Sequence, residues 1–404
     1  MNPKTFMLIA GEASGDLLAA ELVSALRAQA SRGDPTSAPR FFGAGGPKMA
    51  AAGVELALDL TQHSVVGISD VLKNYLKFRG LFNQLLALAI ERKPDVLIGV
   101  DFGGFNLRFG HAVRNYVRGN PFSNWNPKIV QFVSPQVWAS RPGRADRLAA
   151  DYDLVLSIFP FEKDWYAQRT PNLRVEFVGH PMLDRFANDE AQLSPRPPEA
   201  ASIVDRKSQI LLLPGSRTSE LKKHLPVMFG ALELVRAKLP GATAKMILPD
   251  EALKKLAVDL SAPPVGVEIQ IGGLPEALAQ AGLAIASTGT VTMECALFGV
   301  PAVTLYKTSW FNFEIAKRLV TVKWATMPNI LANEEVYPEF IQNAATAENL
   351  ARAALDLLQN QPRREKIQTQ LATIVSSLGG GGACRRAASA IANLFAAPPA
   401  ATTT

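Results

Sequence analysis

The stretch from Ser287 to Ala302 carries residues suited to binding a nucleotide. A small polar loop, Ser287–Thr290, separates an apolar run that predicts a buried strand from a helical pattern over 291–298. Free amides of a first helical turn, together with loop hydroxyls, attract an anion. Glu294, in the first two turns of that helix, is placed to accept hydrogen bonds from ribose hydroxyls. A capped helix in an α/β core explains the loop but not Glu294, so we favour a nucleotide site.

A second polar loop, Pro214–Arg217, follows the apolar run 209–213 and precedes a helical pattern. Ser216, Arg217 and the loop amides would suit a phosphate or pyrophosphate. A surface turn with a solvated arginine is an equally good interpretation of this loop alone. Two such loops in one half of the chain favour the functional interpretation.

Asp101 is a candidate general base because it ends the apolar run 95–100, where a buried strand would open into a site. A lone aspartate at a strand end is often only a turn former or helix cap, and Gly103 and Gly104 fit that alternative. His180, in Gly179-His-Pro181 after the run 175–178, is the second choice, because imidazole is the commoner base.

Two basic stretches could meet anionic groups. Residues 65–86 interleave apolar and basic side chains, as in a core-facing helix or in a segment that dips into a bilayer. The side chains expected to face the membrane are Val65, Val66, Ile68, Leu72, Lys73, Lys77 and Arg79. Residues 140–147 hold three arginines after Trp138, which fit either a substrate phosphate or a solvated helix start.

The elements that must position these residues alternate between strand and helix along the whole chain. Strands are expected near residues 5–10, 40–43, 95–100, 128–133, 154–159 and 175–178, and again near 209–213, 243–248, 267–271, 283–286 and 302–306. This alternation predicts parallel sheets covered by helices on both faces. Ligands of such sheets lie beyond the carboxyl ends of the strands, where the polar loops above occur.

A proline-rich stretch divides the chain. Pro195, Pro197 and Pro198 lie in residues 186–208, which we interpret as a linker between domains 1–185 and 209–378. Four glycines at 379–382 precede a last helix, near 383–396, that is expected to close back on the first domain. A disordered tail is expected over 397–404. The fold class is therefore α/β, with two Rossmann-like domains facing a central cleft.

Composition narrows the classes of function. The formal charge of +6 in 404 residues suggests an anionic partner, but no basic helix with interleaved aromatics indicates nucleic acid. Two cysteines and four scattered histidines fit neither a disulfide framework nor a metal site, so no metal or cofactor is expected and the cytoplasm is the simplest compartment. No apolar stretch reaches transmembrane length.

Taken together, the motifs closely resemble the lipid-A-disaccharide synthase family of inverting GT-B glycosyltransferases. They are GEASGD at 11–16, GAGGPKM at 43–49, VGISDVL at 66–72, PDVLIGVDFGGFN at 94–106, VSPQVWASR at 133–141, FPFEKDWY at 159–166, FVGHPMLD at 177–184, LLLPGSRTSE at 211–220, STGTVTMECAL at 287–297 and MPNIL at 327–331. They run in family order over nearly the whole chain.

The resemblance implies a reaction and a set of contacts. Such enzymes join UDP-2,3-diacylglucosamine to 2,3-diacylglucosamine 1-phosphate, forming a β-1′,6 linkage and releasing UDP, at the cytoplasmic face of the Gram-negative inner membrane. Asp101 would be the general base. UDP would lie against Ser216, Arg217, Ser287, Thr288, Gly289, Thr290, Glu294 and Asn329. The acceptor would lie against Ser14, Gly45, Gly46, Asn106, Arg141 and Arg144.

The chain departs from the family pattern at two positions. Gly104 stands where the family often has a second aspartate, and Ser140 stands where an aromatic residue is usual. Two other classes of function remain open: a GT-B-like UDP-N-acetylglucosamine 2-epimerase, and a non-catalytic nucleotide-sugar-binding peripheral membrane protein. A homodimer is also left open.

Overall fold

The computed structural model describes residues 4–31, 38–61, 75–187 and 209–396. The chain divides into two compact units. The first comprises residues 1–187 and 378–404, and the second comprises residues 188–377. Val65, Val66, Ile68, Leu72 and Lys73 lie outside the described residues.

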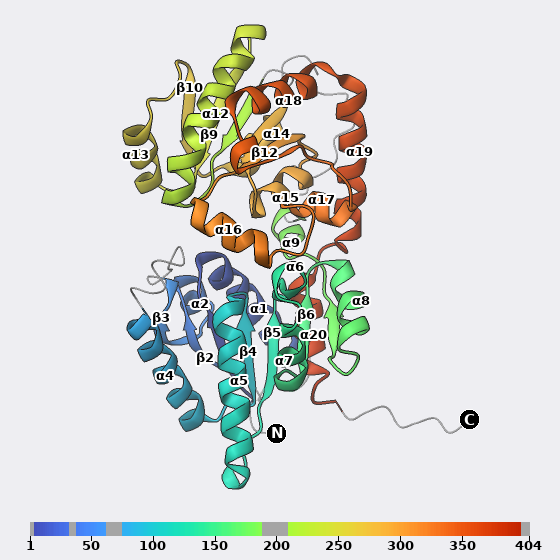
Figure 1. The fold of residues 1–404 in the computed structure, drawn as a ribbon. Helices are drawn as coiled ribbons and strands as arrows, with labels where there is room; N and C mark the ends of the chain where they lie inside the picture. The colour runs from blue at the N-terminus through green and yellow to red at the C-terminus, as the bar shows by residue number, and fades with distance from the viewer. Residues whose placement is uncertain (1–3, 32–37, 62–74, 188–208, 397–404) are drawn as a thin grey trace, which may run out of the picture. The chain divides into compact units, whose positions relative to one another are not determined.

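The first unit is a seven-stranded parallel sheet in the order β3-β2-β1-β4-β5-β6-β7, with helices on both faces (Figure 1). Its strands are β1 (Thr5–Ala10), β2 (Arg40–Gly45), β3 (Glu55–Asp59), β4 (Val96–Val100), β5 (Lys128–Phe132), β6 (Leu154–Ser157) and β7 (Val175–Phe177). Its helices are α1 (Ala13–Ser31), α2 (Pro47–Ala51), α4 (Tyr75–Arg92), α5 (Gly103–Gly119), α6 (Val137–Ser140), α7 (Arg144–Asp151), α8 (Pro160–Arg169), α9 (Met182–Ala187) and α20 (Ala383–Ala392).

The second unit repeats this plan with six parallel strands in the order β10-β9-β8-β11-β12-β13. They are β8 (Gln209–Leu213), β9 (Thr243–Leu248), β10 (Val267–Ile271), β11 (Leu283–Ser287), β12 (Ala302–Tyr306) and β13 (Glu339–Ile341). The helices are α12 (Thr218–Lys238), α13 (Glu251–Leu260), α14 (Leu274–Gln280), α15 (Thr290–Leu297), α16 (Trp310–Leu319), α17 (Met327–Ala332), α18 (Ala347–Gln359) and α19 (Gln361–Ser377).

The central strands are buried along their whole length. Every residue of β4, β6 and β11 is buried, as expected for parallel strands covered on both faces. On one face of the first sheet, Met7 and Leu97 pack with Leu85 of α4 and Phe109 of α5 in the main core cluster. This rigid layer fixes where each strand ends, and therefore where the polar loops begin.

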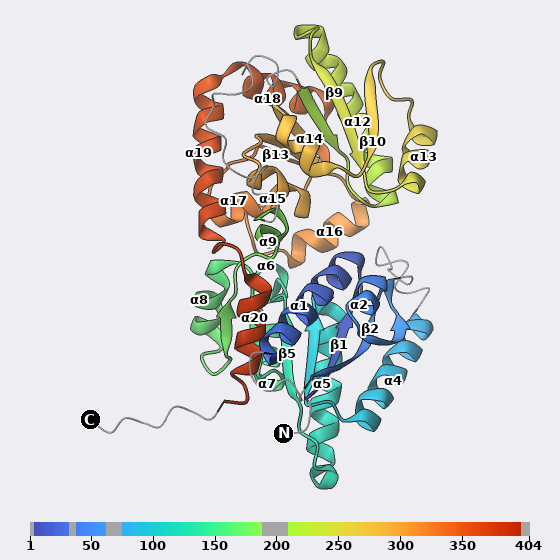
Figure 2. The same cartoon turned by 180° about the vertical axis from the view of Figure 1, so that it is seen from behind.

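The last helix belongs to the first unit, as predicted. Helix α20 packs along α1, on the face seen in Figure 2. Arg386 of α20 donates hydrogen bonds to the carbonyl oxygens of Val178, Gly379, Gly380 and Gly381 at 2.7–3.1 Å. Three of the four consecutive glycines have positive φ, which glycine adopts without strain. The glycine run therefore wraps its carbonyls around one arginine and joins the C-terminal helix to β7.

Candidate functional site

Asp101 lies at the carboxyl end of β4 in a constrained backbone. Asp101 and Phe102 have φ values of 49° and 46°, in the left-handed region, which costs non-glycine residues about 1–2 kcal/mol each. The Asp101 carbonyl accepts hydrogen bonds from Asn106 Nδ2 at 2.8 Å and from Gln131 Nε2 at 2.9 Å. Both amide side chains are buried. The surrounding core therefore holds the Asp101 backbone in a conformation that the chain would not otherwise favour.

The carboxylate of Asp101 is in a state suited to accepting a proton. Asp101 is an exposed residue, yet the protein atoms packed around its carboxyl group partly desolvate it and raise its pKa, and the nearby Glu12 carboxylate raises it further. No cation among the described residues forms an ion pair with it. A base is more effective when its pKa moves toward the working pH, so these surroundings favour Asp101 in that role.

His180 has the opposite properties. The ring is buried, and its Nδ1 accepts a hydrogen bond from the Met182 amide at 3.2 Å. Burial, followed by the charge of Arg185, lowers the pKa of His180 to about 4. An imidazole with so low a pKa and one nitrogen already bonded is a weak base at neutral pH.

The glycine-rich loops after β1 and β2 hold each other in place. Asp16 is buried and accepts hydrogen bonds from the amides of Gly46, Lys48 and Met49 at 2.8–3.0 Å, which caps α2. A Cβ at Gly46 would lie 2.7 Å from Asp16 Oδ2. The structure therefore gives Gly45 and Gly46 a packing role and commits the Gly46 amide to Asp16, while Ser14 is exposed in the first turn of α1.

Asn106, expected to contact the acceptor, instead points into the protein. Its Nδ2 reaches the carbonyls of Asp101 and, at 3.4 Å, Ile9. It positions the Asp101 backbone rather than presenting a polar group to solvent. Gly104, by contrast, is exposed, and a Cβ there would meet nothing within 4 Å.

An arginine cluster lies beside the loop after β5. Arg141 and Arg144, predicted from the sequence, are joined by Arg147 and by Arg108 of α5. Partial burial and the three neighbouring positive charges lower the pKa of Arg144. None of the four forms an ion pair with a carboxylate in the described part of the chain. Such a cluster is suited to an anionic group with several oxygens, such as a phosphate.

A buried network of hydrogen bonds joins α6, which follows β5, to α8. Trp138 Nε1 donates to Glu162 Oε1 at 2.9 Å, and the Phe159 amide donates to Glu162 Oε2 at 3.3 Å. Burial raises the pKa of Glu162 to about 7. Ser134 also bonds Tyr166 at 3.2 Å. The local sequence around Glu162 does not indicate this network, because Trp138 belongs to another helix, 24 residues earlier in the chain.

In the second unit, Glu220 shapes the Pro214–Arg217 loop. It accepts hydrogen bonds from the Ser216 amide at 3.1 Å and from Arg217 Nη1 at 3.3 Å. Gly215 has φ of 116°, and a Cβ there would lie 2.1 Å from Glu220 Oε2. The Arg217 side chain is 49% exposed. The loop thus holds a guanidinium at the end of β8, restrained on one side and open to solvent on the other.

His224 joins two loops at this end of the second sheet. Its Nδ1 lies 2.7 Å from the Pro214 carbonyl oxygen, and its Nε2 accepts from the Lys307 amide at 3.1 Å. A carbonyl at one nitrogen and an amide donor at the other require the neutral tautomer protonated at Nδ1. Burial lowers the pKa of His224 and favours this neutral form. The local sequence does not distinguish His224 from the other scattered histidines, because its partners are distant in the chain.

The predicted anion-binding segment Ser287–Thr290 joins the end of β11 to the start of α15. Ser287 is buried, whereas Gly289 and Thr290 are exposed at the start of α15. In the described part of the chain, the first-turn amides of Thr290 and Val291 meet no acceptor, as is usual at a helix N-terminus. Glu294 is half-buried in the second turn of the same helix.

Asn329 has a structural role. It is fully buried and donates to Tyr337 O and Glu339 Oε1, both at 2.8 Å. Its Oδ1 accepts from the amides of Val336 and Tyr337. These bonds use its two donors and its acceptor oxygen, so the side chain orients α17 and is not presented to a ligand.

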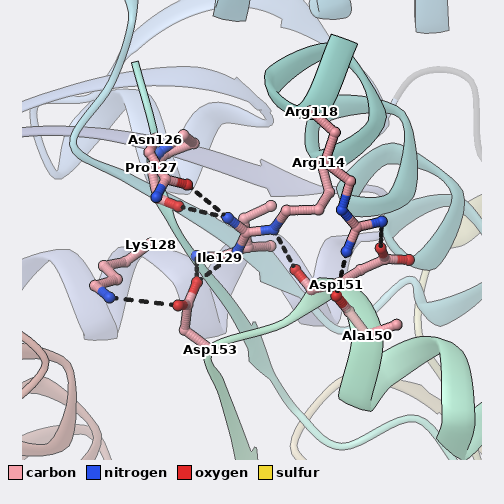
Figure 3. A network of polar contacts seen from close by, with 9 residues as sticks. All are labelled: Arg114, Arg118, Asn126, Pro127, Lys128, Ile129, Ala150, Asp151 and Asp153. Carbon is pink, nitrogen blue, oxygen red and sulfur yellow. Dashed lines mark hydrogen bonds and ion pairs between the residues drawn. The ribbon is translucent and has the colours of Figure 1, made fainter. Parts of the chain in front are cut away.

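Ion pairs gather at the opposite end of the first sheet. Arg114 of α5 donates to Asp153 Oδ2 at 2.6 Å, and Arg118 Nη1 lies 3.4 Å from Asp151 Oδ1 (Figure 3). Lys128 and the Ile129 amide also meet Asp153. These contacts tie α5 and α7 to the amino ends of β5 and β6, far along the strands from Asp101.

Across the described ranges, His, Cys, Asp and Glu side chains nowhere gather in a group of three that could hold a metal ion. None of the helices in those ranges combines the length and apolar composition of a membrane span. Of the predicted membrane-facing residues, Arg79 is described and exposed on α4.

The two parallel-sheet units define the GT-B class, which is shared by glycosyltransferases and nucleotide-sugar epimerases. The structure is similar over 97% of this chain and 100% of the other to a UDP-GlcNAc 2-epimerase from Neisseria meningitidis bound to UDP-GlcNAc, with a TM-score of 0.60 at 11% identity. It is similar over 98% of this chain and 100% of the other to the calicheamicin glycosyltransferase CalG4, with a TM-score of 0.56 at 16% identity.

Sequence comparison then identifies the family. Residues 6–394 match the lipid-A-disaccharide synthetase family. A lipid-A-disaccharide synthase from Trichlorobacter lovleyi is 36% identical over 94% of both chains, and one from Geobacter metallireducens is 35% identical over 93% of both. The chain belongs to the lipid-A-disaccharide synthetase family, which confirms the resemblance seen in the motifs.

Proposed function

We propose that the protein condenses UDP-2,3-diacylglucosamine with 2,3-diacylglucosamine 1-phosphate to give a β-1′,6-linked disaccharide 1-phosphate and UDP. Membership of the lipid-A-disaccharide synthetase family is the observation that carries this proposal. The residues at the carboxyl ends of the two sheets supply groups that such a transfer requires.

In the proposed reaction, the acceptor 6-hydroxyl oxygen attacks the anomeric carbon of the donor. The bond from that carbon to the diphosphate oxygen breaks, and the electron pair leaves with UDP. Asp101 takes the hydroxyl proton, and the raised pKa of Asp101 suits this step. Inversion follows because one displacement occurs.

The second unit is proposed to hold UDP. Arg217 and the amides at the start of α15 would stabilise the charge that builds on the leaving diphosphate. Glu294 would accept hydrogen bonds from the ribose. Glu220, His224 and Asn329 would act indirectly by shaping these loops, as their internal hydrogen bonds indicate.

The first unit is proposed to hold the acceptor. The cluster of Arg108, Arg141, Arg144 and Arg147 would bind the acceptor phosphate. Ser14, exposed in the first turn of α1, would be a further acceptor contact. We further propose that the protein works at the cytoplasmic face of the inner membrane as a peripheral protein.

The test is to incubate the purified protein with both acylated substrates and to analyse the products by mass spectrometry. We expect UDP and the disaccharide 1-phosphate in equal amounts. A parallel incubation with UDP-N-acetylglucosamine alone tests the epimerase alternative. Formation of the 2-epimer without any disaccharide would overturn the proposal, and binding of UDP without either product would favour the non-catalytic alternative.

A further inference from the structure

Helix α16 (Trp310–Leu319) is unusual because none of its residues is buried. It follows β12 and is capped by Ser309, whose Oγ accepts a hydrogen bond from the Asn312 amide at 3.2 Å. Phe313, Ile315 and Leu319 are half-buried. These side chains are therefore more covered than those of Trp310 and Phe311, which are exposed.

The outer side of α16 presents two large aromatic rings. Trp310 is 74% exposed and Phe311 is 64% exposed, and Val320 just beyond the helix is 47% exposed. Val258, Leu260 and Val265 are also exposed and close in the sequence, but they are aliphatic, and Trp310 and Phe311 are the one pair of adjacent exposed aromatic side chains in the described part of the chain. Two adjacent exposed aromatic rings, with Val320 close by, indicate a surface that is covered in use.

Two cations share that side of the helix. Lys317 lies seven residues, or about two turns, after Trp310, and Arg318 lies the same distance after Phe311, so each pair projects in a similar direction. Both cations are exposed, and neither forms an ion pair in the part of the chain that the structure describes. Glu314 is the one acidic residue on this helix and is only half-exposed.

Exposed aromatic rings followed by unpaired cations match the interface of an anionic bilayer. Tryptophan and phenylalanine favour the headgroup boundary, and lysine and arginine beside them attract lipid phosphates. A symmetric contact with a second copy would instead bring the cations of both copies together. The charge pattern therefore favours a lipid surface over self-association.

We propose that α16 is an interfacial helix, with Trp310 and Phe311 seated in the headgroup region of an anionic bilayer and Lys317 and Arg318 against lipid phosphates. This contact lies in the second unit and is separate from the membrane-facing residues predicted in 65–79. It rests on the proposed function only in that the substrates are lipids.

The position of α16 in the second unit relates the proposed bilayer contact to the candidate UDP loops. Helix α16 follows the carboxyl end of β12, and the two candidate UDP loops follow the carboxyl ends of β8 and β11 in the same sheet. Lys307, in the segment leading into α16, is joined through His224 to Pro214 of the first UDP loop. A bilayer bound to α16 would therefore lie at the same end of the sheet that is proposed to receive a lipid-linked donor.

The test measures binding of the full-length protein to vesicles of phosphatidylcholine and phosphatidylglycerol in equal parts. The double variant Lys317→Gln, Arg318→Gln should bind about thirtyfold more weakly. Trp310→Ser with Phe311→Ser should weaken binding at least about tenfold. Two control variants change similar side chains elsewhere in the second unit. Val265→Ser removes an apolar side chain that is 95% exposed, and Lys254→Gln with Lys255→Gln removes two cations from α13. Both controls should bind as the parent does.

Fluorescence quenching by brominated phospholipid locates Trp310 directly. The parent should be quenched, and Trp310→Phe should lose most of that quenching while still binding vesicles. Equal quenching in the two proteins, or unchanged binding in both double variants, would overturn the proposal. If the double variants lost self-association while their vesicle binding stayed unchanged, the proposal would also be overturned. The exposed side of α16 would then be assigned to contact with a second copy of the chain.

Activity in detergent micelles separates this proposal from the proposed function. The α16 variants should retain turnover within about twofold in micelles, where no bilayer is needed. If the parent makes no disaccharide in micelles, the proposed function fails, whereas the vesicle result still decides the role of α16.

Discussion

Carboxylate side chains lie at both ends of the first sheet, but their electrostatic surroundings differ. At the amino ends of β5 and β6, Asp151 and Asp153 each meet one or more cations, and Arg114 alone contacts four residues there (Figure 3). At the carboxyl end of β4, Asp101 meets no cation among the described residues, and Glu12 adds to its negative surroundings. Paired carboxylates stabilise the fold, whereas an unpaired one is available to take a proton.

The two ends of the sheet therefore differ in their effect on the stability of the folded state. Ion pairs and charge-assisted hydrogen bonds at the amino end lower the free energy of the folded state. At the carboxyl end, the positive φ of Asp101 and its raised pKa both cost stability. Substitutions at the two ends should therefore separate activity from stability, and four predictions test this comparison.

The largest effect is expected at Asp101. Asp101→Asn keeps the size of the side chain and tolerates positive φ, but it removes the base. We expect turnover to fall by at least about a hundredfold, with folding and UDP binding nearly intact. Steady-state UDP release, thermal unfolding and calorimetry with UDP measure the three quantities. Turnover near the parent's in Asp101→Asn, together with a collapse in His180→Ala, would transfer the role to His180.

Glu162 should make stability depend on pH. Its folded-state pKa of about 7 lies above the ordinary value of 4.5, so the folded state keeps a proton that the unfolded state releases. The contribution of Glu162 to the free energy of unfolding should therefore fall as the pH rises between these values, by about 3 kcal/mol in all, and level off above about pH 7. His180, whose pKa is lowered, contributes a rise over an overlapping range, so the Glu162 contribution is the difference between parent and variant.

Glu162→Gln should remove this contribution, because the amide cannot ionise, so the variant should gain stability relative to the parent as the pH rises. Denaturant unfolding at about pH 5 and about pH 8 measures it. Asp164→Asn, at an exposed position on the same helix, is the matched control and should keep the parent's slope. A slope that is unchanged in Glu162→Gln would show that other groups cause it.

Asp153→Asn tests the amino end. It weakens the contacts with Arg114, Lys128 and the Ile129 amide, and we expect it to lower the free energy of unfolding by about 2 kcal/mol. Turnover below the melting range should stay within about twofold. Loss of turnover without loss of stability would contradict the proposed division between the two ends.

The smallest effect is expected at Arg217. Its side chain is half exposed, so water screens its charge, and Arg217→Ala should raise the donor KM about tenfold. The acceptor KM should change little. Lys254→Ala, a surface change in the same unit, is the control. An equal loss of affinity for both substrates would contradict the assignment of UDP to the second unit.

Much of the fold could be predicted because its strands are apolar runs. The predicted strand over 5–10 coincides with β1 (Thr5–Ala10), and the strand over 209–213 coincides with β8. Edge strands β3 and β13 were not predicted. β3 carries charged residues and is largely exposed or half-buried, and β13 spans three residues, so neither has a clear local pattern.

The site was predictable only in part, because local patterns locate loops but not their internal contacts. Strand ends indicated Asp101, Arg217 and Ser287–Thr290. Nothing in the sequence showed that Asn329 would use its hydrogen bonds internally. Nor did it show that His224 would join Pro214 to Lys307, which lies 83 residues after His224. Such contacts between distant segments depend on how the sheet brings its loops together.

The account rests most directly on proton removal by Asp101 during glycosyl transfer. A single-turnover experiment, with enzyme in excess and both acylated substrates bound, isolates that step from binding and product release. We predict that Asp101→Asn slows disaccharide formation by at least about a hundredfold, while Asp153→Asn matches the parent. Disaccharide formation at the parent's rate in Asp101→Asn would contradict the account.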